Sequence, residues 1–182
     1  MGQYYRPVLK NKAGHILVLN RYVDGRFTMA KLTEHSWWEN TFVSTVTKML
    51  YHEPMRIAWG GDYADDVGTE LAKKLHRIAW GDDVDGEGVE ADEMLLDGKF
   101  ILNHTKKLFL NCDMYKRDCT DEYGWTLHPL PLLTAIGNGH GGGDYIGINE
   151  QNVGCWAFDE IEISDIVPKD YQPIVCKWID ER

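Results

Sequence analysis

Residues 4–9, YYRPVL, and residues 15–23, HILVLNRYV, form two apolar stretches on either side of a short polar turn. The turn is Asn11-Lys12-Ala13-Gly14, and apolar runs of this length around such a turn are typical of a β-hairpin. Asp24-Gly25 is a second turn signal, so a further strand is expected at residues 26–29, RFTM. The amino-terminal part of the chain therefore predicts paired strands.

Two helices are expected after this hairpin. Ser36-Trp37-Trp38-Glu39 has the S-x-x-E form of a capping box, and the helix that it begins ends at Glu53-Pro54. A second helix is expected to start at Asp65 or Asp66, with Gly81 as its carboxyl-terminal cap. Apolar residues recur at helical spacing in both, which places one stripe of each helix against a core. These residues are Trp38, Phe42, Val46, Met49 and Leu50, and then Val67, Leu71, Leu75 and Ile78.

The rest of the chain favours strands. Arg56-Ile57-Ala58-Trp59 is expected to be a short strand closed by Gly60-Gly61, and Lys99 to Asn111 a hairpin that turns near His104 to Lys107. After Trp125 the chain is rich in Pro, Gly and β-branched residues, so no helix is expected there. The strands expected in this last part are Leu130 to Ile136, Val153 to Phe158 and Ile174 to Trp178.

The length of the chain and this order of elements together predict its architecture. A chain of 182 residues with 43% hydrophobic residues can bury the core of one domain. We expect a single α+β domain over residues 1–182, with a mostly antiparallel sheet, two main helices in the first half and a strand-rich second half.

Charge is unevenly distributed along the chain. The formal net charge is −10, which disfavours a basic nucleic-acid-binding protein. Residues 1–60 nevertheless carry a net charge of +4, so contact between this basic part and nucleic acid stays open. Residues 61–100 carry a net charge of −8.

The acidic side chains are densest in a loop expected at about residues 81–97. Eight acidic residues occur there without a Lys, Arg or His among them: Asp82, Asp83, Asp85, Glu87, Glu90, Asp92, Glu93 and Asp97. Such a run is commonly a solvated loop. It could also bind a positively charged channel and compete there with phosphate backbones.

Cysteines and hydropathy bear on the compartment. The four cysteines are too few for a disulfide scaffold and include no C-x-x-C pair that could begin a zinc site, so reduced thiols and no metal or cofactor are expected. The amino terminus lacks an apolar signal-peptide core, and the longest aliphatic stretch, Ile16 to Leu19, is far shorter than the roughly 18 residues of a membrane span. The sequence therefore predicts a cytoplasmic protein with no membrane partner.

Residues 137–147, GNGHGGGDYIG, form the most unusual local pattern in the chain. They contain G-x-G-x-x-G, but a dinucleotide site needs a helix directly afterwards, and Asp144 to Asn149 has an extended pattern. Consecutive glycines can point several backbone amides at one anion, or they can form a tight connection that needs positive φ. The residues that would form an anion site are Gly139, His140, Gly141, Gly142, Gly143, Asp144, His128 and His104.

Several segments resemble an uncharacterised family of small proteins from bacteria, phages and mobile elements. They are Met1 to Val8 (MGQYYRPV), Trp59 to Asp65 (WGGDYAD), Asn103 to Lys107 (NHTKK), and His128 to Thr134 (HPLPLLT) running into Gly137 to Asp144. The resemblance covers nearly the whole chain and brings no reaction and no site residue. It implies a setting in which small acidic proteins often act by binding, as anti-CRISPR and related counter-defence inhibitors do.

Charge and setting together give the expected function. We expect a non-catalytic protein of mobile-element type that binds and inhibits a host defence machine, most concretely a CRISPR-Cas nuclease, through the acidic surface. The alternative is a nucleotide- or anion-binding domain or small enzyme that uses the Gly-rich loop with His140 and Asp144, a cyclic-nucleotide sponge included. A third hypothesis for the function is a host-encoded interaction module without catalysis.

Overall fold

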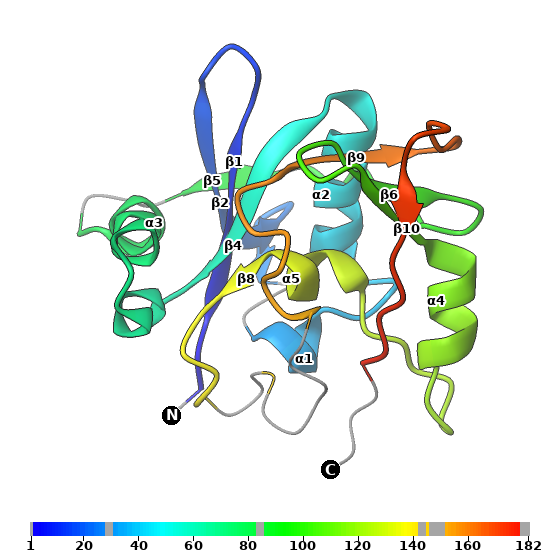
Figure 1. The fold of residues 1–182 in the computed structure, drawn as a ribbon. Coiled ribbons are helices and arrows are strands. Elements are labelled where there is room, and N and C mark those ends of the chain that lie inside the picture. Colours follow the sequence, from blue (N-terminus) through cyan, green and yellow to red (C-terminus); the bar gives the residue numbers. More distant parts are fainter. Residues whose placement is uncertain (1, 28–30, 83–85, 142–144, 146–151, 179–182) are drawn as a thin grey trace.

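The protein is built on a mostly antiparallel sheet with helices on both of its faces (Figure 1). The computed structural model describes residues 2–27, 31–82, 86–141, 145 and 152–178. The strands are β1 Tyr5–Lys10, β2 Ile16–Val23, β3 Arg26–Phe27, β4 Met55–Gly61, β5 Glu87–Val89, β6 Phe100–Asn103, β7 Leu108–Asn111, β8 Ala135–Ile136, β9 Glu160–Ser164 and β10 Gln172–Pro173. The helices are α1 Leu32–His35, α2 Thr41–His52, α3 Glu70–Trp80, α4 Cys112–Cys119 and α5 Pro129–Thr134, with a 3₁₀ helix, η1, at Ala64–Val67.

The strand order confirms the expected α+β class. The sheet runs β10-β7-β6-β9-β4-β1-β2-β3, while β5 pairs with β2 and β8 pairs with β4. Neighbours are antiparallel except in the pairs β10–β7, β5–β2 and β8–β4. Strand β9, although late in the chain, lies between β4 and β6 and joins the two halves of the sheet.

Both hairpins expected from the sequence are present. Strands β1 and β2 pair through Val8 and Val18, and their turn is closed by a hydrogen bond from the Asn11 N–H to the His15 carbonyl. Strands β6 and β7 pair from Phe100 to Asn111, with a turn at 104–107. Local turn signals and a two-residue period were sufficient to locate these elements.

The first long helix, α2, begins later than the capping box predicted. Its cap is Asn40, whose side-chain oxygen accepts the backbone N–H groups of Phe42 and Val43 at 3.0 and 3.1 Å. Residues 37–38 cannot be helical because they pair with the extended segment 126–127, where the Trp38 N–H donates to the Thr126 carbonyl. Ser36 follows the last residue of α1 and donates its hydroxyl to the carbonyl of Leu32, the first residue of that helix. Its predicted role as the amino-terminal cap of the long helix was therefore wrong.

Replacing this cap provides a direct test of where α2 begins. Asn40→Ala is expected to lower the free energy of unfolding by about 1 kcal/mol, because two amide groups lose their acceptor. Glu39→Ala removes the residue that the capping box would use, and we expect a change below about 0.5 kcal/mol because Glu39 is exposed. Urea unfolding of both variants measures the difference, and a larger loss in Glu39→Ala than in Asn40→Ala would contradict the assignment.

The second long helix, α3, also starts later than expected. Residues 64–67 form η1, and Gly68, with φ of 83°, separates it from α3. Thr69 caps α3 by accepting the Ala72 N–H, and Gly81 follows the helix at its carboxyl end, as the sequence predicted.

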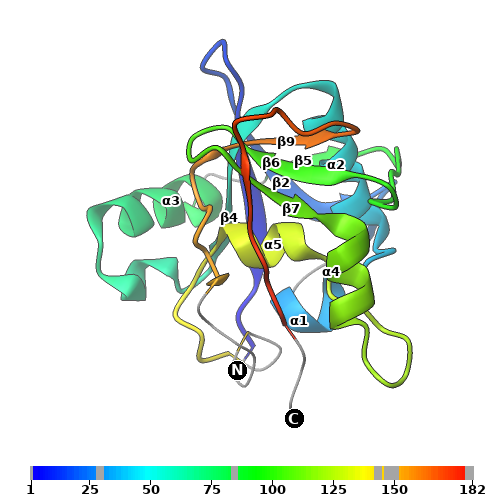
Figure 2. The ribbon, with the colours of Figure 1, turned by 45° about the vertical axis from the view of Figure 1, so that its right-hand side comes forward.

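Side chains alternate along the central strands between the two faces of the sheet. Leu9 and Trp59 lie in the main core with α2 and α5, whereas Val8 and Ala58 lie in a smaller cluster under α3. Figure 2 shows α3 on the opposite side of β1 and β4 from α2. Among the described residues, no helix is both long and apolar enough to cross a bilayer.

The expected strand at 130–136 was wrong. Residues 129–134 are helix α5, which His128 caps by accepting the Leu130 N–H, and only 135–136 form a strand. Pro129 fits the first turn of this helix, because backbone N–H groups in that turn have no partner within the helix and proline has no N–H. The expectation that no helix would follow residue 125 was therefore also wrong.

Two further strands were placed incorrectly, and one helix was missed. Residues 153–158 form turns, in which the N–H groups of Gly154 and Trp156 donate to the carbonyls of Leu132 and Leu133. The strand expected at 174–178 is instead β10, at 172–173. Helix α4 had no assignment from the sequence.

Candidate functional site

The acidic segment, residues 86–97, is held against the rest of the protein by its backbone. Strand β5 pairs with β2, with Val89 opposite Val23, and the Asp24 N–H donates to the Val89 carbonyl at 3.0 Å. Farther on, the Asp92 N–H donates to the Thr45 hydroxyl of α2 at 3.3 Å. The segment therefore presents its side chains from a fixed path along β2 and α2.

Most of the carboxylates along this path point to solvent. Asp82 is exposed, as are all five acidic residues of the segment: Glu87, Glu90, Asp92, Glu93 and Asp97. Asp92 pairs with Lys48 at 2.8 Å. Within the described part of the chain, Asp82, Glu87, Glu90 and Glu93 have no ion pair. Asp83 and Asp85 lie outside the described residues.

Asp97 differs from the other acidic residues of this run. Its carboxylate accepts hydrogen bonds from Lys116 at 2.8 Å and from the Trp38 indole at 3.2 Å. The hydrogen bond from Lys116 lowers the pKa of Asp97, against a smaller opposing effect of burial. This residue joins α4 to the start of α2, so we assign it to the fold rather than to a binding surface.

The described part of the Gly-rich loop packs on the amino-terminal strand. Gly141 lies against the backbone of Gln3 so closely that a Cβ atom would overlap it. Gly139, with φ of 73°, lies under the ring of Tyr145, whose hydroxyl donates to the Gly137 carbonyl at 3.1 Å. These glycines allow close approach of two chain segments. Gly142, Gly143 and Asp144 lie outside the described residues.

His140 lies on the exposed surface of this loop. The backbone N–H of His140 donates to the side-chain oxygen of Asn138 at 3.0 Å. The side-chain amide nitrogen of Asn138 donates to the Asp66 carboxylate at 3.2 Å. These contacts connect the loop to η1. Of the described residues placed with His140 in the anion-site hypothesis, Gly139 and Gly141 are its neighbours along the chain, whereas His104 and His128 belong to other elements.

His128 is buried between α2 and α5 and does not line an open site. Its Nδ1 accepts the Leu130 N–H at 3.2 Å, so the ring proton lies on Nε2 and faces the Thr47 hydroxyl at 3.2 Å. Burial lowers the pKa of His128 to about 3, because the charged ring would lose its hydration. The histidine is therefore neutral and structural at physiological pH.

His104 has two side-chain partners at the end of β6. Its ring nitrogens contact Glu162 and the Tyr171 hydroxyl, each at 2.6 Å. These partners come from β9 and from the segment before β10. His128 is enclosed in the core, and His104 contacts Glu162 and Tyr171, so the structure gives no support to a site that both would line with His140. Across the described ranges, no cluster of His, Cys, Asp and Glu could hold a metal ion.

Segments that carry the family resemblance make contacts that support the fold. The Tyr4 N–H donates to the Asp62 carboxylate at 3.0 Å, which joins the amino terminus to the WGGDYAD segment. In the NHTKK segment, Asn103 and Lys106 both donate to Asp159, at 2.8 and 2.5 Å. These three hydrogen-bonded contacts show that the side chains of Asp62, Asn103 and Lys106 contribute to the fold.

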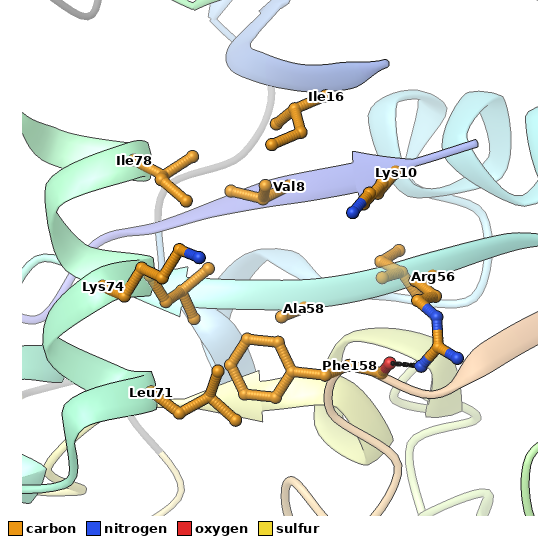
Figure 3. Close-up of a pocket in the computed structure, with 11 residues that line it drawn as sticks. Val8, Lys10, Ile16, Arg56, Ala58, Leu71, Lys74, Ile78 and Phe158 are labelled. Carbon is orange, nitrogen blue, oxygen red and sulfur yellow. Dashed lines mark hydrogen bonds between the residues drawn. The ribbon is translucent and has the colours of Figure 1, made fainter. Parts of the chain in front are cut away.

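A groove that the sequence analysis did not identify lies between α3 and strands β1 and β4 (Figure 3). It has a volume of about 170 Å³. We call it the α3 groove. Its apolar wall and floor are Val8, Ala58, Leu75, Ile78 and Phe158. Its three cations are Lys10, Arg56 and Lys74. The two-residue period of the strands could have revealed it, since Lys10 shares a face with Val8, and Arg56 shares a face with Ala58.

Comparison with known proteins identifies no relative of this chain. No family model, no curated protein and no solved structure matches the chain.

Proposed function

We propose that the protein acts by binding, and that its acidic segment, together with Asp82, occupies a positively charged nucleic-acid channel of a host defence enzyme. The most concrete partner is a CRISPR-Cas nuclease in the host cytosol, a choice that follows the setting implied by the family resemblance. The acidic side chains compete there with phosphate groups of DNA or RNA.

The observation that carries this proposal is the way the acidic side chains are presented. Glu87, Glu90 and Glu93 are exposed, and no cation of the described residues pairs with them. Their backbone is tied to β2 and α2, so less conformational entropy is lost on binding than for a free loop. The nucleotide- or anion-binding alternative has less support, because His104 and His128 are engaged in separate parts of the fold.

Neutralising these glutamates tests the proposal. In the variant Glu87→Gln, Glu90→Gln, Glu93→Gln, we expect inhibition of DNA cleavage by a guide-loaded Cas9-type nuclease to weaken about tenfold, since three charge pairs with the channel are lost. The wild-type interaction should itself weaken between about 0.05 M and about 0.3 M salt, because added salt shortens the screening length. Cleavage assays and direct binding measure both effects.

A charge-matched control separates the segment from net charge. The variant Glu39→Gln, Glu70→Gln, Glu122→Gln removes three exposed glutamates on other elements and should inhibit as the wild type does. Absence of binding at low salt, or equal inhibition by the two triple variants, would contradict the proposal.

A further inference from the structure

The α3 groove combines an apolar floor with cations that the described residues leave without counter-ions. Lys10 and Arg56 are direct cross-strand partners on β1 and β4, so their side chains emerge from the same face. Like charges placed directly opposite each other destabilise a sheet. An anionic group bound between Lys10 and Arg56 would reduce this repulsion. Figure 3 shows both side chains at one end of the groove and Lys74, from α3, at the other.

Neighbouring groups only partly compensate these charges. Arg56 donates to the Phe158 carbonyl at 3.0 Å, and Glu160 of β9 is its cross-strand partner on the other side. No ion pair joins Arg56 to Glu160, and none is formed by Lys10 or Lys74, within the ranges that the structure covers. A chain of net charge −10 thus keeps three cations around one apolar surface.

The size of the groove limits what can occupy it. Its volume of about 170 Å³ is below the roughly 300–1,000 Å³ of sites that enclose a drug-sized molecule. Such a space accepts one or two large side chains. Two aliphatic side chains that line it, Ile16 and Leu71, are each 52% exposed and extend the apolar surface beyond the floor. This combination is typical of a site where a partner inserts an anchor residue.

We propose that the α3 groove binds an acidic peptide segment of a protein partner. The segment inserts one or two large apolar side chains against Val8, Ala58 and Phe158. Its carboxylates bind Lys10, Arg56 and Lys74 at the two ends of the groove. Charge complementarity selects an acidic partner, and the small volume favours a peptide anchor over an enclosed ligand. This surface has the opposite sign to the acidic segment and is independent of the function proposed above.

Selection from a phage-displayed library of random dodecapeptides tests the proposal on the full chain. We expect the selected peptides to combine several acidic residues with one or two of Leu, Ile, Phe or Trp. In the variant Lys10→Glu, Arg56→Glu, the affinity for the best synthetic peptide should fall at least about tenfold, because attraction becomes repulsion. Both residues are exposed, so we expect the variant to fold, and circular dichroism is the measurement that checks this.

Controls and contrary outcomes keep the test specific. Lys169→Glu, Lys177→Glu makes the same change of charge on exposed lysines outside the groove and should leave peptide affinity unchanged. The triple glutamine variant of the acidic segment should also bind the peptide normally, which separates the two proposals. The inference would be overturned if the selected peptides lacked acidic residues. It would also be overturned if the variant Lys10→Glu, Arg56→Glu bound the best peptide with the same affinity as the wild type. If no acidic peptide is selected and the protein binds decanoate, the occupant of the groove is a small amphipathic anion. If the wild type self-associates and the variant Lys10→Glu, Arg56→Glu does not, the occupant is a second copy of the chain.

Discussion

Lowering the pH from 7 to 5 is expected to reduce the free energy of unfolding by about 2 kcal/mol through His128 alone. Burial lowers the pKa of this histidine to about 3 in the folded protein, from an ordinary value of 6.5. The unfolded state therefore binds the proton first as the pH falls. Stability is fully present above the unfolded pKa and is lost as the pH falls from 6.5 toward 3. Urea unfolding at a series of pH values measures this slope.

Variants at this position and at its partner isolate the effect. His128→Asn keeps a side-chain oxygen that can cap α5 but cannot titrate, so its stability should change about 2 kcal/mol less between pH 7 and 5 than that of the wild type. Thr47→Ser keeps the hydroxyl that faces His128 and should retain the wild-type slope. An unchanged slope in His128→Asn would show that the histidine is accessible to protons in the folded state.

Gly141→Ala is expected to cost about 3 kcal/mol of stability, a large effect for the addition of one methyl group. The new Cβ would overlap the backbone nitrogen of Gln3, and a backbone atom cannot move aside as the end of a flexible side chain can. Because Gln3 is buried beside Tyr5, the shift would spread into β1. Thermal and urea unfolding measure the loss.

Gly88→Ala is the matched control for this substitution. A Cβ at Gly88 would have only the Asn20 side chain within reach, at 3.9 Å, so stability should stay the same or rise by up to about 1 kcal/mol. If Gly141→Ala is as stable as the wild type, the glycine is not needed for the contact with Gln3, and the anion-nest interpretation of the loop regains support.

The elements that the sequence predicted correctly are those fixed by nearby residues. The hairpins follow from short turns such as Asn11 to Gly14 and from apolar alternation, both of which act within a few residues. The start of α2 depends instead on pairing between Trp37 and Leu127, far apart in the chain, and no local signal reports it. At α5, the sequence rule treated Pro129 as a strand or turn signal, whereas a buried cap at His128 starts a helix.

The candidate sites divide in the same way. Charge and exposure of Glu87, Glu90 and Glu93 could be expected from composition alone. The environments of His104 and His128 could not, because burial among distant elements decides them. For the α3 groove, the two-residue period could place Lys10 with Val8 and Arg56 with Ala58, but the pairing of Lys10 with Arg56 and the opposite wall from α3 required the structure.

The position of β9 has a consequence for synthesis on the ribosome. The β1–β2–β4 strands and the β6–β7 hairpin emerge early, but the strand that joins them begins only at Glu160. Until then, the nascent chain carries two partial sheets, with the facing edges of β4 and β6 open to other polypeptides. Ile161 and Ile163 of β9, both buried in the finished core, then close that gap. The two halves of the sheet can therefore join only after residues 160–164 have been translated, and we expect the open edges of β4 and β6 to be prone to pairing with other strands until then.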